Sequence, residues 1–284
     1  MAEPILKWAG GKRQITQEVL RHFPVDFRKR AFHEPMVGAG AITFLIEPKK
    51  GSINDINNRL MTMYKVIRNH PHELIEENRK HVYDKKYFYS ARRKFNSSLA
   101  GAQSDSIEES SLLIYLNRTC WNGLYRVNSK GEFNVPFGGY KNPDFVQEER
   151  ILRISQILKN LKIRSGDYSY VVKESRRGDV VYFDPPYQPT SATSSFTSYT
   201  REGFGIEEQV RLRDTILTLG DKGVMSILSN SDSSELVRLY EGYDSLTITR
   251  IRARRAINCN GSKRGEVGEI IVANVPDDLK GLRF

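Results

Sequence analysis

The sequence of 284 residues predicts an α/β fold in which a layered sheet is interrupted by a mostly helical insertion. Short apolar runs alternate with helical patterns near both ends of the chain, which is typical of a sheet covered by helices. The stretch from Asn57 to Trp121 carries helical patterns alone. Because 39% of the residues are hydrophobic, the chain can bury a substantial core.

Glycine turns divide the first part of the chain into short elements. A turn at Gly10 and Gly11 precedes a helical pattern, and a glycine turn at 38–40 separates a strand from a helix. The next apolar run ends at Asp55. The predicted elements are a helix over 14–22, a strand over 31–34, a helix over 41–46 and a strand over 51–54.

The insertion is predicted to be a group of helices followed by a hairpin. Pro71, after Asn69, is a first-turn proline that begins a new helix. The small and polar stretch 97–110 has the composition of a linker. Residues 125–137 alternate as strands do around a turn at 129–131, which predicts a hairpin. The predicted helices span 57–69, 72–82, 84–96 and 107–118.

After Asp144 helices and strands alternate again, and Gly220 is predicted to end one of the helices. Arg250, Arg252 and Arg254 share one face of a basic strand, which favours a solvated face over a phosphate contact. The predicted helices span 146–160, 206–219 and 232–240, and the predicted strands 161–164, 179–183, 224–229, 245–252 and 268–275.

Composition restricts the classes of function. A formal net charge of +10 favours a polyanionic partner. We expect no membrane span, because no run reaches about 18 apolar residues, and no signal peptide. Two distant cysteines, Cys120 and Cys259, favour a reducing cytoplasm over a disulfide framework. The five histidines lack the spacing of metal ligands, so no metal is expected.

The motif DPPY, Asp184 to Tyr187, follows the apolar run VVYF. Ligands of open α/β sheets bind beyond the carboxyl ends of the strands. The two prolines lack N–H groups and do not continue a helix, so the carbonyls of Asp184 and Pro185 stay available. Carboxylate and carbonyl can accept both hydrogens of an amine on a flat ring, on which Tyr187 stacks. Taken alone, the four residues fit an ordinary turn equally well.

Two further motifs are compatible with a nucleoside ligand. Gly38 and Gly40 lie between a strand and a helix and allow close approach to the backbone, while Asp55 can accept bonds from ribose hydroxyls. The G-x-G pattern lacks the third glycine of a dinucleotide-binding fingerprint. On its own, a G-x-G pattern usually has a structural role rather than a ligand-binding role. KWAGGK, 7–12, offers a ring and charges, although Trp8 could equally be a core residue between solvated lysines.

The stretch 117–143 combines basic and aromatic residues. Basic groups bind phosphates, arginine reads guanine, and aromatic rings stack on bases, although an ordinary solvated hairpin is the alternative. The residues concerned are Arg118, Arg126, Lys130, Lys141, Trp121, Tyr125, Phe133 and Tyr140.

These four motifs, in this order, resemble the DNA adenine methyltransferase (Dam) family, which transfers a methyl group from S-adenosylmethionine to adenine N6. The resemblance runs over nearly the whole chain, from KWAGGK to SKRGEVGEIIVAN, and NGLYRVN with GEFNVPFG indicates the branch that recognises GATC. It implies a Rossmann-like S-adenosylmethionine-dependent methyltransferase sheet formed by 1–56 and 145–284. It also implies an inserted target-recognition domain, 57–144, that carries the hairpin.

The resemblance implies three sets of site residues. Asp55 would hold the ribose hydroxyls and Asp167 the adenine amine of the cofactor. Trp121 and Asn122 would fill the space left by a flipped base. The cofactor set is Trp8, Ala9, Gly10, Lys12, Glu34, Pro35, Gly38, Gly40, Asp55, Asp167, Tyr168 and Asp184. The set at the target adenine is Asp184, Pro185, Pro186 and Tyr187. The DNA set is Lys7, Arg118, Trp121, Asn122, Leu124, Arg126, Asn134, Pro136, Tyr140 and Lys141, whereas Gly139 stands where relatives carry a basic residue.

The chemistry that the resemblance implies needs the target adenine outside the duplex, so we expect base flipping. Positioning and electrostatics would supply the catalysis without a metal, and S-adenosylhomocysteine would be the product. We expect 188–205 to act as a lid. The expected partner is double-stranded DNA, and the enzyme is expected to act as a monomer. Its expected location is the cytoplasm, either at the nucleoid or, for an enzyme encoded by a phage, in the cytoplasm of the host cell. Restriction–modification, phage and solitary roles remain open.

Rival functions remain. An N4-cytosine methyltransferase needs the same chemistry, but such enzymes more often have Ser or Thr where Asp184 stands. A C5-cytosine enzyme needs a cysteine after proline, which neither Cys120 nor Cys259 provides. DPPY alone also permits methylation of RNA or protein amines. A DNA-binding module without catalysis is the remaining alternative, which a cofactor titration distinguishes.

Overall fold

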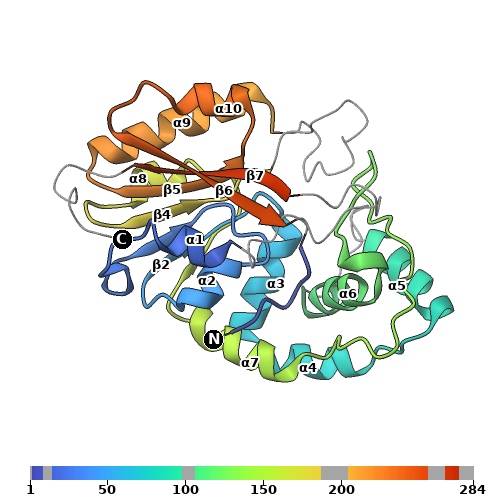
Figure 1. Cartoon of the computed structure of the whole chain (residues 1–284). Coiled ribbons are helices and arrows are strands. Elements are labelled where there is room, and N and C mark those ends of the chain that lie inside the picture. Colours follow the sequence, from blue (N-terminus) through green and yellow to red (C-terminus); the bar gives the residue numbers. More distant parts are fainter. Residues whose placement is uncertain (1, 9–14, 98–105, 187–203, 255–265, 275–284) are drawn as a thin grey trace.

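The computed structural model describes residues 2–8, 15–97, 106–186, 204–254 and 266–274 (Figure 1). Its centre is a seven-stranded sheet in the order β3-β2-β1-β4-β5-β7-β6. Strands β1 to β5 run parallel, and β7 is antiparallel to both of its neighbours. The α/β class is confirmed. The strands are β1 (Phe32–Glu34), β2 (Gly51–Ile53), β3 (Lys162–Ile163), β4 (Val180–Phe183), β5 (Met225–Ser231), β6 (Leu246–Arg254) and β7 (Glu266–Asn274).

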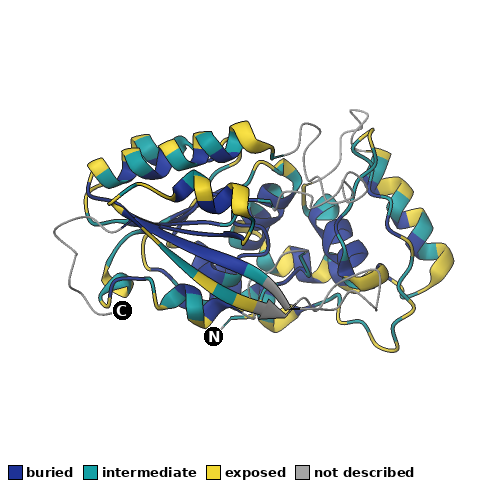
Figure 2. Ribbon diagram, turned by 45° about the horizontal axis from the view of Figure 1, so that its top comes forward, coloured by how far each residue is buried: buried dark blue, intermediate teal, exposed yellow. Residues whose placement is uncertain are grey.

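Helices cover both faces of the sheet (Figures 1 and 2). Val181 and Phe183 of β4 pack with the helices α8 to α10, whereas Val180 and Tyr182 pack with α1 and α2. Because β4 is buried on both faces, its sequence is a continuous apolar run. These helices are α1 (Thr16–Leu20), α2 (Ala41–Ile46), α8 (Tyr170–Glu174), α9 (Ile206–Asp221) and α10 (Ser234–Tyr240), with a 3-10 turn, η2, at Phe27–Lys29.

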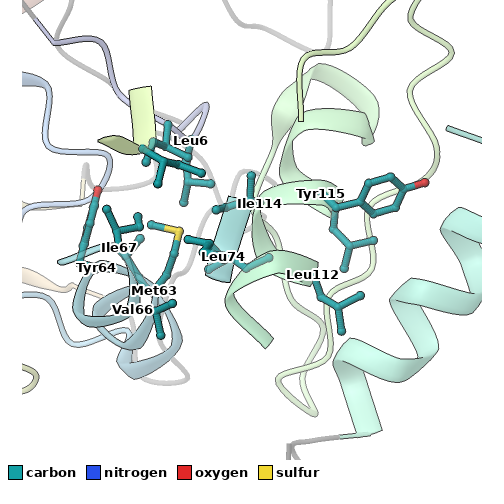
Figure 3. Packing of buried hydrophobic residues seen from close by; sticks show 14 of the residues in the cluster. Leu6, Met63, Tyr64, Val66, Ile67, Leu74, Leu112, Ile114 and Tyr115 are labelled. Carbon is teal, nitrogen blue, oxygen red and sulfur yellow. The ribbon is translucent and has the colours of Figure 1, made fainter. Parts of the chain in front are cut away.

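The remaining helices pack beside the β1–β2–β3 edge. One apolar cluster joins Leu6, Val37 and Ile53 to side chains of the helical region, so the two parts share a core. Figure 3 shows Met63 of α3 and Ile114 of α6 gathered with Leu6 in this cluster. The helices are α3 (Asn58–Asn69), α4 (Pro71–Arg79), α5 (Lys85–Ser97), α6 (Ser106–Thr119) and α7 (Glu148–Leu158), with a 3-10 turn, η4, at Trp121–Gly123.

Several predicted boundaries differ from the structure. Gly220 does not end α9, which continues to Asp221, and the left-handed Gly223 (φ +71°) makes the turn instead. The first turn of α6 lies within the predicted linker. The predicted hairpin strands are reduced to isolated bridges, Val127 with Phe133 and Cys120 with Phe137.

Two surface features have simple explanations. Arg250 and Arg252 are exposed on the edge strand β6, in agreement with the predicted solvated face, and Arg250 lies 3.3 Å from an Asp232 oxygen. The side chain of Arg254 lies outside the described residues. Within the described ranges, no helix combines the length and apolarity that a bilayer crossing requires.

Candidate functional site

The carboxyl ends of the parallel strands meet at one edge of the sheet, and polar residues follow each of them. Glu34 ends β1, Asp55 comes two residues after β2, and Asp184 directly follows β4. Asp167 lies in the segment between β3 and α8, and Ser229 lies near the end of β5. The topology therefore brings residues from distant parts of the sequence to the edge where α/β sheets bind ligands.

The glycine loop after β1 has a conformation that side chains would obstruct. Gly38 (φ +49°) donates its N–H to Asp55 Oδ2 over 3.1 Å. Gly40 has φ +73°, and a Cβ atom there would lie 2.4 Å from the Phe44 ring. Glu34 is buried and accepts bonds from the N–H and the hydroxyl of Thr43 at the start of α2. Bonds within the protein therefore fix the conformation of this loop. Its two left-handed positions are occupied by glycines, which adopt that conformation without strain.

Asn54 and Ile56, which flank Asp55, were not predicted as site residues. The buried Asn54 amide donates to Pro35 O over 2.9 Å and to Gly166 O over 2.8 Å, connecting the segments after β1 and β3. Ile56 is 59% exposed, and exposed apolar surface at a ligand-binding edge is available to a ligand. In the sequence, the position of Asn54 between an apolar run and Asp55 was the signal that could have identified it as a site residue.

Asp184 is positioned by the neighbouring strand. Ser229 of β5 lies with its hydroxyl 3.2 Å from Asp184 Oδ1, and the Tyr182 hydroxyl lies 2.8 Å from the same Ser229 hydroxyl. Both hydroxyl residues are buried, whereas Asp184 is partly exposed. Pro185 is buried and Pro186 is partly exposed. The sequence alone did not identify Ser229.

The site concentrates acidic groups within a basic chain. Burial raises the pKa of Glu34 to about 8 despite the bonds from Thr43, and the nearby Asp184 and Asp55 carboxylates raise it further. Burial also raises the pKa of Asp55, against bonds from the Asn57 and Gly38 backbone. These carboxyl groups are close enough to interact, and Glu34 is protonated at neutral pH. The negative charge that favours a cationic ligand at this edge therefore comes from Asp55 and Asp184 rather than from Glu34.

Trp8 connects the glycine loop to the region beyond α6. A Cβ atom on Gly38 would lie 3.1 Å from the Trp8 indole, and Trp8 stacks on Tyr125 with ring centroids 5.2 Å apart. Tyr125 is 8% and Phe133 only 1% exposed, so the prediction that these two rings stack on bases is wrong. They pack in the core because the alternation around 129–131 turns them inward.

The residues of the predicted DNA set lie in η4, in the hairpin and in the segments next to them, and their side chains are exposed or half-buried. Trp121, Asn122, Pro136 and Lys141 are exposed, and Leu124 is partly so. Arg126 Nε donates to Asn134 Oδ1 over 2.8 Å, and Lys7 Nζ lies 4.3 Å from the Tyr140 ring centroid. Arg118 Nε donates to Asp144 O over 2.9 Å.

A buried asparagine connects this region to the N-terminal segment. Asn117 Oδ1 accepts from Lys7 N over 2.8 Å, and its amide donates to Lys7 O over 2.8 Å and to Gly123 O over 3.0 Å. A Cβ atom on the left-handed Gly123 would lie 2.3 Å from the Lys7 stem. Lys7 is therefore seated directly against η4.

Asp167 contacts a residue that sequence reasoning did not identify. Both of its oxygens accept bonds from the guanidinium of Arg211 in α9, and its loop neighbour Tyr168 is buried. Ala9, Gly10, Lys12 and Tyr187 lie outside the described residues, as does all of the predicted lid except 204 and 205. Among the residues that are described, no group of three or more His, Cys, Asp or Glu is arranged to hold a metal.

The sheet order, with β7 antiparallel between β5 and β6, and the glycine-lined acidic edge define the class of Rossmann-like S-adenosylmethionine-dependent methyltransferases. Residues 8–257 match the family of D12 class N6 adenine-specific DNA methyltransferases, and the chain belongs to that family. It is therefore an enzyme that methylates adenine N6 in DNA, and members of such families generally take the methyl group from S-adenosylmethionine.

Relatives of known name cover nearly the whole chain. The Type II methyltransferase M1.LlaDCHI of Lactococcus lactis subsp. cremoris is 44% identical over 275 residues, 95% of each chain. The Type II methyltransferase M.MjaIII of Methanocaldococcus jannaschii is 40% identical over 290 residues, 96% of this chain and 99% of the relative. The DNA adenine methylase of Escherichia coli strain K12 is 32% identical over 275 residues, 95% of each chain. The resemblance to DNA adenine methyltransferases is confirmed.

Proposed function

We propose that this enzyme transfers the methyl group of S-adenosylmethionine to N6 of an adenine flipped out of double-stranded DNA, within GATC. The observation that carries the proposal is the position of Asp184. It directly follows β4, is held by Ser229, and lies beside the acidic, glycine-lined edge. A carboxylate fixed there can accept a hydrogen bond from an amine brought to the cofactor.

The residues at this edge fit S-adenosylmethionine by their chemistry. Asp55 keeps acceptor capacity for ribose hydroxyls, and the exposed Ile56 offers an apolar surface to the adenine ring. The carboxylates of Asp55 and Asp184 favour the positive sulfonium, whereas Glu34, whose pKa is raised to about 8, is protonated at neutral pH. Gly38 lets the ligand approach the backbone. When bound, the cofactor supplies an activated methyl group. Trp8, Pro35, Gly40, Asp167 and Tyr168 complete the described part of the proposed set, to which Ala9, Gly10 and Lys12 belong by sequence.

The chain's part in the reaction is to hold the target amine. Asp184 and the carbonyl of Pro185 accept the two hydrogens of N6, which moves the nitrogen towards a pyramidal shape and frees its lone pair. Because nitrogen becomes more acidic as it is alkylated, its proton can leave afterwards and Asp184 need not be a strong base. Pro186 and Tyr187 complete the proposed site, and 188–205 is proposed to close over it.

The exposed region around η4 and the hairpin is the proposed DNA surface. Trp121 is 53% exposed, and the exposed Asn122 beside it has a left-handed backbone (φ +54°), which is uncommon for a residue other than glycine. Both residues would fill the space of the flipped adenine. GATC recognition rests on the motifs NGLYRVN and GEFNVPFG, with base contacts from Lys7, Leu124, Arg126 and Pro136 and further DNA contacts from Arg118, Asn134, Tyr140 and Lys141.

The division into a catalytic domain, 1–56 with 145–284, and a recognition domain, 57–144, is part of this proposal, as are action as a monomer and a cytoplasmic location. Side chains of α3, α6 and the sheet share one apolar cluster. This shared cluster supports the proposal that the recognition domain and the catalytic domain are fixed relative to each other. A rigid connection suits an enzyme that must bring a flipped base to a fixed amine-binding site.

Changing Asp184→Ala tests the proposal. We expect methyl transfer to an unmethylated GATC duplex to fall by about 1,000-fold, because the amine loses its charged acceptor. Titrations should show that the affinity for DNA stays within about threefold of the parent. The affinity for S-adenosylmethionine should fall far less than the rate, because Asp184 is only one of the groups in the cofactor set. The matched control, Asp221→Ala, removes an exposed carboxylate at the end of α9 and should leave the rate unchanged. An Asp184→Ala enzyme that methylates at nearly the parent rate would contradict the mechanism.

A further inference from the structure

Arg211, on the second turn of α9, is engaged by the loop that carries Asp167 and Tyr168. Its Nη1 lies 2.9 Å from Asp167 Oδ2 and its Nη2 lies 2.6 Å from Asp167 Oδ1. The guanidinium carbon also lies 4.9 Å from the Tyr168 ring centroid. Such a planar, two-bond contact orients a carboxylate more tightly than a single donor can.

The remaining bonds of Asp167 leave one of its oxygens open to a ligand. Among the described residues, Oδ1 accepts from Arg211 and from Ser169 N over 2.9 Å, and Oδ2 accepts from Arg211 over 2.9 Å. The Ser169 hydroxyl also acts on this carboxylate, whose pKa it lowers. A carboxylate oxygen can accept about two hydrogen bonds. Oδ2 therefore has room for one N–H from outside, and the side chain of Asp167 is 47% exposed, so a ligand can reach it.

We propose that Arg211 is a positioning residue that aims Asp167 Oδ2 at the 6-amino group of the cofactor's adenine and so determines the enzyme's selectivity for adenosyl ligands. The inference rests on the proposed role of Asp167 in cofactor binding. Arg211 itself does not contact the reacting atoms. Arg211 affects how strongly the enzyme prefers a cofactor whose purine has a 6-amino group over one whose purine lacks it.

The geometry distinguishes this role from that of an ordinary surface ion pair. An exposed pair on a helix usually contributes little and tolerates other partners. Here Arg211 also lies 3.1 Å from Glu208 of its own helix, which would satisfy its charge without Asp167. The guanidinium instead engages both oxygens of Asp167 and lies over Tyr168, so that helix α9 fixes the loop after β3.

Calorimetric titration with two ligands tests the proposal. The probes are S-adenosylhomocysteine and its analogue in which hydrogen replaces the adenine 6-amino group. We expect the parent to prefer the amino form by about tenfold, as one hydrogen bond to a charged group provides. Arg211→Gln should reduce this preference to less than about threefold, and Arg211→Lys should give an intermediate value. A preference in Arg211→Gln that stays within about twofold of the parent value overturns the proposal.

The matched control is Arg213→Gln. Arg213 lies on the same helix but contacts Asp214 and the Tyr243 ring, so its loss should leave the preference intact. A second variant, Asp167→Ala, separates the inference from the function on which it rests. If Asp167→Ala loses the preference and Arg211→Gln keeps it, the inference alone fails. If Asp167→Ala keeps the preference, the proposed role of Asp167 fails, and the inference fails with it.

The pH dependence adds a readout that a purely structural role would not change. Partial burial opposes ionisation of Asp167, but the bonds from Arg211 and Ser169 hold its pKa below the ordinary value. The charged group that acts on Asp167 is Arg211 of α9, which Glu208 of the same helix also contacts, and Tyr168 is the titratable loop neighbour of Asp167. Without Arg211 the pKa should rise, so the preference should disappear at a higher pH than in the parent. Identical pH profiles would contradict the proposal.

Discussion

Two buried hydroxyl groups hold the residue on which the proposed chemistry depends. Ser229 contacts Asp184, and Tyr182 contacts Ser229 from the other side. If Ser229 donates to the carboxylate, the Tyr182 hydroxyl donates to Ser229, and the row of hydroxyls restricts the orientation of Asp184. Neither hydroxyl needs to contact the substrate to affect the rate.

We predict that Ser229→Ala lowers kcat for methyl transfer by about tenfold with little change in the affinity for S-adenosylmethionine, because Asp184 loses its orienting donor. Steady-state kinetics and calorimetry measure the two quantities. Ser226→Ala is the control, since Ser226 is a buried serine of the same strand whose hydroxyl has no hydrogen-bond partner within the described residues. A kcat for Ser229→Ala equal to that of Ser226→Ala would show that Ser229 does not orient the carboxylate.

Glu34 gives a second prediction for a single side chain. Burial raises its pKa from an ordinary 4.5 to about 8, so the folded state holds a proton that the unfolded state releases over this interval. The contribution of Glu34 to stability is therefore present below about pH 4.5 and lost as the pH rises to about 8. Glu34→Gln can still accept both bonds from Thr43 and should remove this part of the pH dependence.

Thermal unfolding between pH 5 and 9 measures the effect without cofactor. The difference in melting temperature between Glu34→Gln and the parent should grow in favour of the variant as the pH rises. A difference that stays constant across this range would mean that Glu34 titrates alike in the folded and unfolded protein.

Sequence predicted the residues whose role follows from their place in the chain. Asp184 directly follows β4, and Asp55 and Gly38 come within a few residues of the ends of β2 and β1, so the fold alone brings them to the ligand-binding edge. Ser229 and Arg211 could not be identified in this way, because their partners lie 45 and 44 residues away in the chain. Their contacts depend on which strands become neighbours and on how α9 packs, and no local pattern records either.

At the scale of elements, α6 supports both the core and the proposed DNA surface. It is buried on most of its circumference, and its last turn carries Asn117, whose amide contacts Lys7 and Gly123. The N-terminal segment, α6 and η4 therefore meet at a single buried side chain. Because Asn117 holds the backbone of Lys7, the side chain of Lys7 lies beside the ring of Tyr140.

We predict that Asn117→Ala destabilises the protein by about 2–4 kcal/mol, because the backbone groups of Lys7 and the buried carbonyl of Gly123 lose their partners. It should also weaken DNA binding more than cofactor binding, since Lys7 is released from η4. Urea unfolding and DNA titration measure both effects. The control, Asn69→Ala at the exposed end of α3, should cost less than about 0.5 kcal/mol. Equal effects of the two substitutions would refute this role.

Element boundaries were predicted best where local signals agree with packing. The helix over 41–46 matches α2 because the left-handed Gly40 immediately precedes it. Helix α8 was missed, since its five residues are too few for a periodic pattern. The sequence predicts Gly220 as a stop signal, but Gly220 packs against Asn274 of β7 and needs a small side chain rather than a positive φ. Tertiary contact explains that glycine, and sequence pattern does not.

At the scale of the whole molecule, charge is distributed unevenly. The chain carries a formal net charge of +10, yet the carboxylates of Asp55 and Asp184 gather beside the protonated Glu34 at one edge of the sheet. This separation suits an enzyme that binds polyanionic DNA on one region and a cationic methyl donor on another. The shared core between the sheet and the helical region connects the two.

One measurement tests the central claim most directly. Plasmid DNA without methylated bases is incubated with the enzyme and S-adenosylmethionine, and single-molecule sequencing then identifies each modified base and its context. We predict N6-methyladenine within GATC, and none when the cofactor is omitted. N6-methyladenine in another context would contradict the proposed recognition by 117–143 while leaving the chemistry of Asp184 in place. Plasmid that remains unmethylated although the enzyme binds the cofactor would contradict the account as a whole.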